Sequence, residues 1–278
     1  MASIRIDQAE GLRRMVARPA PRVLTFLSAT PDHEKSATLL NLGASLAVAV
    51  AVAFFGIASA QAYIWVAIGG AGATAVFVYA IGSLGRGGPT PLKLALAGVA
   101  TSVAFLSLVL AIMLSRGDVA GGLQSWQVGG VGGATFARLV PVLPFLAAGL
   151  AISLACARKL NSLALGDEMA AGLGERVAVA RGLAALGAIL LCGAITAVCG
   201  PIAFVGLIVP HLCRVLVGVD HRWLLPFSAL VGACLLIASD IAGRLIARPG
   251  ELDVGIVTAF VGAPFFIWIV RRARVREL

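Results

Sequence analysis

The chain alternates between long apolar runs and short polar breaks. A helix of about 20 apolar residues crosses the hydrocarbon core of a bilayer, which is about 30 Å thick. The run at 203–217 is short and contains Pro210, so we expect it to be kinked or partly re-entrant. The pattern predicts eight membrane-spanning helices, over residues 40–58, 62–82, 92–114, 139–157, 182–199, 203–217, 224–242 and 254–270.

Composition agrees with this interpretation. Hydrophobic residues make up 60% of the 278 residues and charged residues only 13%, which is far too little polar surface for a soluble domain of this size. We therefore expect an all-α integral membrane protein, a polytopic bundle of about eight helices. Residues 1–36 are predicted to be a polar N-terminal extension of unclear role, and residues 37–278 a transmembrane domain.

The distribution of charge predicts an orientation. The net charge is +9, but the basic residues lie at the ends of apolar runs and not in a basic domain with interleaved aromatic residues, so nucleic acid is not an expected partner. If both termini are cytoplasmic, that side holds 18 of the 22 Lys and Arg residues. The outer side then keeps Arg116, Arg138, Arg244 and Arg248. This asymmetry predicts cytoplasmic termini.

Residues 158–181 form the most substantial cytoplasmic segment in this topology. Apolar residues recur there at roughly helical spacing, namely Leu163, Leu165, Met169 and Leu173. We expect a short amphipathic helix that is broken near Gly172–Gly174. Its middle is acidic, which disfavours anionic lipid and favours a protein partner.

Signs of enzymatic or metal chemistry are scarce. No GxxxxGK[ST] loop occurs, GGVGGAT at 129–135 lacks the phosphate-binding lysine, and the five cysteines form no CxxC pair. We predict no catalytic residue, no metal ligand and no bound cofactor. His211 is expected to make a structural hydrogen bond to a neighbouring helix, and Asp240 and Arg244 are spaced to pair on one helix face.

Residues 200–226, GPIAFVGLIVPHLCRVLVGVDHRWLLP, place an apolar run beside a charged turn, Asp220-His221-Arg222. This stretch resembles the signature of the FecCD-type permeases of ABC importers. The resemblance continues through residues 228–244 and 254–270 downstream, and through residues 92–100, 160–174 and the stretch from Trp126 upstream. It covers roughly residues 41–272.

The resemblance implies a permease subunit with the type II importer fold, resident in the plasma (inner) membrane. The expected partners are a second permease copy, identical or paralogous, a cytoplasmic ABC ATPase dimer that uses the ATP, and an extracytoplasmic substrate-binding protein. The expected substrate is an iron(III)-siderophore or a related chelate such as haem or cobalamin. Catalysis would lie in the ATPase partner, so this chain is not expected to be an enzyme.

The resemblance also implies roles for particular residues. Contact with the ATPase is assigned to Leu165, Gly166, Asp167, Glu168, Leu173 and Gly174. Arg244 is assigned to docking of the binding protein, and Thr90 and Pro91 to a cytoplasmic gate loop. Structural signature roles fall on Gly206, Pro210, His211, Asp220, His221, Arg222, Asp240, Gly262 and Pro264.

The chain departs from the family at its beginning. The match starts near residues 41–45, and residues 1–36 do not resemble the family's first two spans, its RLPR-like stretch or its NPLA-type loop. We therefore expect a permease without those two spans. A truncated gene model, a degenerate non-transporting paralogue and a missing half supplied by another chain remain open. An ion-coupled secondary transporter is disfavoured, because deep acidic residues are few.

Overall fold

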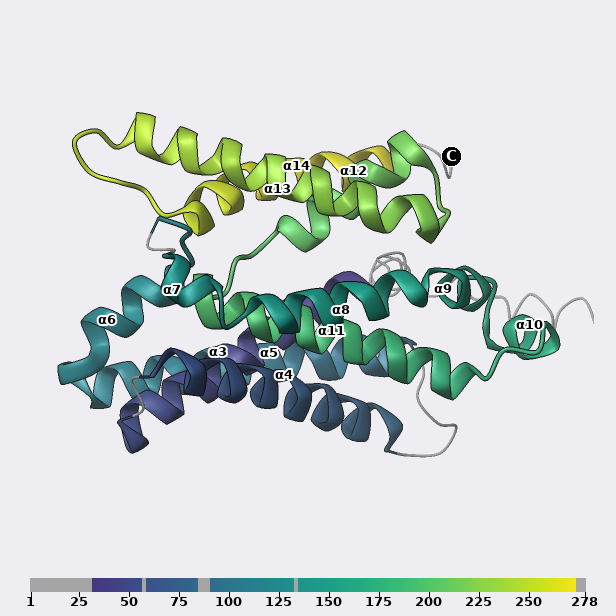
Figure 1. Ribbon diagram of the computed structural model, residues 1–278, viewed down its shortest axis with the longest axis horizontal. Helices are drawn as coiled ribbons and strands as arrows, with labels where there is room; N and C mark the ends of the chain where they lie inside the picture. Colours follow the sequence, from purple (N-terminus) through teal and green to yellow (C-terminus); the bar gives the residue numbers. More distant parts are fainter. Residues whose placement is uncertain (1–31, 57–58, 85–90, 133–134, 274–278) are drawn as a thin grey trace, which may run out of the picture.

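The computed structural model describes residues 32–56, 59–84, 91–132 and 135–273, and within them every regular element is a helix (Figure 1). In chain order the helices are α3 (Asp32–Phe55), α4 (Ala60–Ser83), α5 (Pro91–Ser115), α6 (Gly117–Val128), α7 (Phe136–Leu139), α8 (Leu143–Ala155), α9 (Ala157–Leu163), α10 (Asp167–Gly172), α11 (Val177–Cys199), α12 (Val205–Val217), α13 (His221–Ile246) and α14 (Val254–Ala273). The predicted all-α fold is confirmed.

Each of the eight predicted runs is helical, but not all of them are long enough to span a bilayer. Within the described residues five helices are long and apolar enough, namely α3, α4, α5, α11 and α13, and α8 with α9 makes a sixth if the bent pair is one span. The 13 residues of α12 extend only about 20 Å. The shortness expected for this run is therefore confirmed. The apolar segment Val254–Phe265 of α14 is also short.

The helices lie in two groups. Helices α3, α4, α5, α8 and α11 form what we call the main bundle, and α12, α13 and α14 form a three-helix layer beside it (Figure 1). Ala44, Val48 and Ala67 are fully buried where α3 packs on α4. In the layer, Val209 and Cys213 of α12 pack against Leu224 of α13. The layer thus has a small apolar core of its own.

Small residues allow helices of the main bundle to approach closely. A methyl group added at Gly193 of α11 would lie 2.7 Å from the Cα atom of Ile68 in α4. One added at Gly70 would lie 2.4 Å from the Cβ atom of Ala47 in α3. Inside a membrane the hydrophobic effect does not drive helices together, because lipid is as apolar as the side chains. Close contact between backbones at small residues stabilises the helix pairs through dispersion instead.

Three local predictions need correction. The predicted span 139–157 is divided, because α8 begins only at Leu143 and the chain bends by 50° between α8 and α9. The predicted single amphipathic helix is two short ones, α9 and α10, separated by a turn in which Gly166 has a φ of +100°. Helix α10 does end at Gly172, near the predicted break.

The third correction concerns Asp220-His221-Arg222. Only Asp220 lies in the turn, where it caps α13, while His221 and Arg222 are the first residues of the helix itself. Helix α13 therefore begins three residues before the predicted start of its span and ends four residues after the predicted end. Hydropathy alone places this polar first turn outside the helix, because it does not detect an N-cap residue such as Asp220.

Candidate functional site: the two ends of the bundle

The bundle has two ends, the α10 end and the α6 end, which lie at opposite sides of Figure 1. Helix α13 runs from the first to the second. Most of the polar residues singled out in the sequence lie at one end or the other. The helices between the ends are apolar.

At the α10 end, apolar side chains in and beside α10 are exposed. Leu165, Met169 and Leu173 are 58%, 63% and 65% exposed, and Glu168 is also exposed. Met169 lies within α10, while Leu165 precedes it and Leu173 is its C-cap. Ala170 is fully buried and anchors the helix, and a short anchored helix with exposed apolar side chains around it is suited to insertion into a groove of another protein.

The end of α10 is set by its backbone. The amide of Glu175 donates to the carbonyl of Ala170 at 3.1 Å, and the amide of Gly174 donates to that of Ala171 at 3.0 Å. With Gly174 at a φ of +84°, this is a Schellman motif, which a glycine accommodates without strain. The glycines assigned to this segment thus have a conformational reason, since Gly166 also has positive φ.

The α10 end also contains a polar link that joins α9 to α13. Asn161 Nδ2 of α9 donates to Asp220 Oδ1 at 2.6 Å. Asn161 Oδ1 accepts from the His221 amide at 2.9 Å and lies 2.7 Å from His221 Nδ1. Because the Asn161 oxygen is an acceptor only, Nδ1 must be the protonated ring nitrogen in that contact.

Asp220 is the electrostatic centre of this link. Its Oδ1 also accepts from the Arg222 amide at 3.0 Å. The Arg222 amide, and then the Asn161 side chain, hold the pKa of the Asp220 carboxyl below its usual value. Asp220 is therefore ionised at neutral pH and stabilises the positive end of the α13 dipole.

At the α6 end, Arg244 in the last turn of α13 lies between two carboxylates. Its Nε donates to Asp240 Oδ2 at 3.0 Å, and its Nη1 lies 3.7 Å from Glu251 Oε1. The ion pair expected between Asp240 and Arg244 is confirmed. The Arg244 side chain remains 47% exposed, so it is positioned by its neighbours and still accessible.

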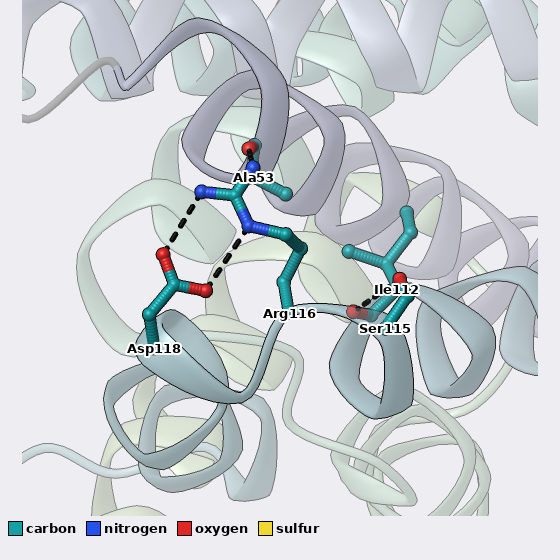
Figure 2. Close-up of polar contacts among 5 residues, drawn as sticks. All are labelled: Ala53, Ile112, Ser115, Arg116 and Asp118. Carbon is teal, nitrogen blue, oxygen red and sulfur yellow. Dashed lines mark hydrogen bonds and ion pairs between the residues drawn. The ribbon is translucent and has the colours of Figure 1, made fainter.

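A second arginine at this end ties three helices together. Arg116, between α5 and α6, forms a two-pronged ion pair with Asp118, from Nε to Oδ1 at 3.0 Å and from Nη2 to Oδ2 at 2.9 Å (Figure 2). Its Nη1 donates to the carbonyl of Ala53 in the last turn of α3. The hydrogen bond and charge of Asp118 raise the pKa of Arg116 further above its usual value.

The three-helix layer is attached to the α6 end through backbone. The Gly255 amide at the start of α14 donates to the carbonyl of Gly129 at 2.9 Å, and the Gly130 amide donates to that of Cys199 at 2.9 Å. A methyl group at Gly255 would lie 1.9 Å from the Val128 carbonyl oxygen, so only glycine fits there. Beside this junction is a cavity of about 720 Å³ lined by Tyr63, Asp118, Trp126, Arg138 and Asp253 among others.

The remaining assigned residues are dispersed. Thr90 lies outside the described residues, and Pro91 is the first residue of α5. Gly206 and Pro210 lie in α12, and Pro264 lies in α14. Gly262 packs against Phe204, whose Cβ and Cγ atoms would lie 2.6 Å from an added methyl group.

His211 does not fulfil its expectation. It is half-buried in α12, and among the described residues the structure records no hydrogen bond from it to a neighbouring helix. Nor does the described part of the chain contain a group of three or more His, Cys, Asp or Glu that could hold a metal ion. Asn161 is the polar residue that sequence reasoning missed. Its partners are 59 and 60 residues away, so nothing in its local pattern signals them.

These features define a helical membrane protein with polar contacts at both ends of its bundle. The chain belongs to the FecCD transport family, whose model matches residues 40–272. The iron(3+)-hydroxamate import system permease protein FhuB of Bacillus subtilis is 44% identical over 193 residues, covering 69% of this chain and 50% of FhuB. The ferric enterobactin transport system permease protein FepD of Escherichia coli is 46% identical over 192 residues, covering 69% and 57%.

A solved structure gives the same fold. It is described as an inward-facing conformation of a metal-chelate type ABC transporter, and it matches 91% of this chain and 85% of its own with a TM-score of 0.73 and 27% identity. The sequence alignments extend over only about half the length of the curated relatives.

Proposed function

We propose that this protein is a membrane-spanning permease subunit of a binding-protein-dependent ABC importer that takes up an iron(III)-siderophore or a related chelate such as haem or cobalamin. The observation that carries the proposal is its membership of the FecCD family, supported by its similarity to FhuB and FepD, which are named for iron(3+)-hydroxamate import and ferric enterobactin transport. ATP hydrolysis belongs to a separate subunit. The permease resides in the plasma membrane with both termini in the cytoplasm.

The ATPase dimer binds at the α10 end in this proposal. The exposed side chains of Leu165, Met169 and Leu173 enter a groove on the ATPase, while Glu168 remains at the rim. Apolar anchors surrounded by polar groups are the usual source of affinity in such contacts. Gly166 and Gly174 set the angles at which α10 projects.

The extracytoplasmic binding protein docks at the α6 end. Arg244 is half-exposed and already oriented by Asp240, so a carboxylate of the incoming protein replaces Glu251, the longer of its two contacts at 3.7 Å. Replacement of one carboxylate by another keeps the guanidinium paired throughout.

A second permease copy completes the pathway. The surface of α14 carries an apolar hollow of about 540 Å³ lined by Val128, Ile256 and Phe260 among others, and Phe260 is 79% exposed. On α5, Val99, Val103 and Leu110 are at least half exposed. These two faces contact their counterparts in the other copy and border the route of the substrate.

Uptake by a reconstituted system tests the proposal. Proteoliposomes that hold this permease, its cognate ATPase and binding protein should accumulate labelled ferric chelate when ATP is present, and should continue to do so when ion gradients are collapsed. Uptake that depends on the ion gradient and not on ATP would contradict the proposal. A chain that assembles with the ATPase but never transports would instead identify the non-transporting paralogue, the second candidate.

A further inference from the structure

We propose that Asn161 is a positioning residue that transmits movement of α10 to the three-helix layer. This inference rests on the proposed function, because it takes α10 as the contact with the ATPase. It adds a role for Asn161, a residue to which the family resemblance assigned none, and it gives a physical route from one end of the molecule to the other.

The connection between α9 and α13 depends on the geometry of one side-chain amide, that of Asn161. Asn161 uses its Nδ2 to donate to Asp220 Oδ1 at 2.6 Å, and its Oδ1 faces both the His221 amide at 2.9 Å and His221 Nδ1 at 2.7 Å. Three polar atoms of the α13 N-terminus thus converge on a single side chain of α9. A donor and an acceptor held 2 to 3 Å from their partners resist both sliding and rotation of one helix on the other.

The bonds of Asn161 to Asp220 and to the His221 ring are not needed to cap α13. Asp220 performs that role itself by accepting from the Arg222 amide at 3.0 Å. A side chain in a separate helix has no part in the usual capping arrangement, which is local in sequence. The bonds of Asn161 therefore connect α9 to α13. One of them also pairs the His221 amide, a donor that has no partner within its own helix.

On one side, the link is joined directly to α10. Asn161 lies in α9, and α10 begins six residues later, after a turn that contains Gly166. Lys159 and Glu175 form a further ion pair across this turn, at 4.0 Å from Nζ to Oε2. A displacement of α10 therefore reaches α9 over a short, braced segment.

On the other side, the link holds the first turn of α13, which belongs to the core of the layer. Leu224 is 4% exposed and packs against Val209 and Cys213 of α12. Helix α13 has 26 residues, about 39 Å in length, and carries Arg244 in its last turn at the other end. Pro226 has no amide hydrogen, so one hydrogen bond within α13 is missing near its start and the first turn can tilt together with α9. Because Leu224 in this turn packs on α12, the tilt also moves the layer.

The layer is pinned to the rest of the chain at both ends. The Asn161 link joins it at the α10 end, and the bond from the Gly255 amide to the Gly129 carbonyl joins it at the α6 end. A body held at two distant points responds to a shift at one of them by rotating about the other. The Asn161 link thus allows ATPase movement at α10 to change the position of the whole layer.

The test is an exchange of partners across the link, carried out in the complete transporter with its ATPase and binding protein. Asn161→Asp places two carboxylates in contact and should break the link. Asp220→Asn combined with Asn161→Asp lets amide and carboxylate trade places, and asparagine still caps α13. Ser162→Ala is the matched control, because Ser162 lies in the same helix and its hydroxyl bonds only the Arg158 carbonyl, at 3.4 Å.

The readout is the amount of chelate transported per ATP hydrolysed, together with the stimulation of ATPase activity by the loaded binding protein. We expect Asn161→Asp to lower both by roughly 2- to 30-fold, the range seen when single residues carry coupling. The double variant should recover most of the loss, and Ser162→Ala should match the wild type. A merely structural role would lower the yield of complex and leave the transport per ATP unchanged.

Two results would overturn the inference. One is an Asn161→Asp transporter with an unaltered ratio, and the other is a double variant no better than the single one. If the Asn161→Asp transporter does not assemble, Asn161→Leu replaces it, because leucine removes the bonds without adding charge. The chelate transported per ATP hydrolysed should then fall in this variant, and an unaltered value would overturn the inference. A wild-type complex that does not transport at all would refute the proposed function instead, so the two failures are distinguishable.

Discussion

Arg244 is shared between Asp240 and Glu251 at the α6 end, and this arrangement decides what its removal should do. Because the side chain is half-exposed, its pairing with a partner's carboxylate is screened by solvent and is expected to be worth about 1 kcal/mol or less. We predict that Arg244→Ala weakens binding of the binding protein by up to about 5-fold and lessens its salt dependence.

Surface plasmon resonance at two salt concentrations measures both quantities. Arg248→Ala is the matched control, an exposed arginine four residues further on. Equal losses in the two variants would show that only net charge at this end matters, and would remove the specific role of Arg244.

Gly262 allows α14 to contact Phe204, a residue with a left-handed φ of 66°. An added methyl group would lie 2.6 Å from Phe204 Cβ, so Gly262→Ala should destabilise the protein by about 1–3 kcal/mol through overpacking. Gly69→Ala is the control, because that position meets no atom within 4 Å and alanine favours helix. Thermal unfolding in detergent should show a lower midpoint for the first variant and an unchanged or higher one for the second.

At the scale of elements, α10 is short and exposed, with apolar side chains in it and on either side of it. If it inserts into the ATPase, the triple variant Leu165→Ser, Met169→Ser and Leu173→Ser removes three anchors and should weaken co-purification at least 10-fold, given about 1 kcal/mol or more for each central apolar residue. Val179→Ser, at an exposed apolar position near the start of α11, should have little effect. Retention of the ATPase by the triple variant would place the contact elsewhere.

The break between α5 and α6 depends on Arg116, which joins Asp118 to the last turn of α3 (Figure 2). Arg116→Gln loses the ion pair and leaves the Ala53 carbonyl without its guanidinium partner. Because the pair is largely exposed, we predict faster amide exchange in residues 112–120 and the end of α3 with little change in overall stability. Arg138→Gln at the same end serves as the control, and hydrogen–deuterium exchange with mass spectrometry gives the result.

At the scale of the whole molecule, the proposed second copy would contact the exposed faces of α5 and α14. Phe260 is the largest described side chain exposed on α14, at 79%. We predict that Phe260→Ala shifts the permease from dimer toward monomer, because an aromatic anchor at an interface centre is worth roughly 2 kcal/mol or more. Mass photometry in nanodiscs measures the shift, and Leu230→Ala, at a 67% exposed position on α13, should leave the dimer intact.

Hydrophobic patterning by itself determined the helical membrane fold and the place of all eight apolar runs, because a bilayer requires long apolar helices whatever their packing. It missed α6, whose 12 residues include three glycines and are not apolar throughout. It also merged α8 with the turn before it, since the residues of that turn, 140–142, are themselves mostly apolar. Motifs identified the family, and local spacing was enough to predict the Asp240–Arg244 pair, because residues four apart on a helix face each other.

Only the tertiary structure decided which distant residues meet. The bonds of Asn161 to Asp220 and His221 cross 59 and 60 residues, and the contact of Arg116 with Ala53 crosses 63. The division into a main bundle and a three-helix layer likewise depends on close contacts such as Gly262 with Phe204. Helix formation depends on residues that are close in sequence, so the sequence pattern predicts it. The packing of one helix on another depends on how their whole surfaces fit together, which only the tertiary structure shows.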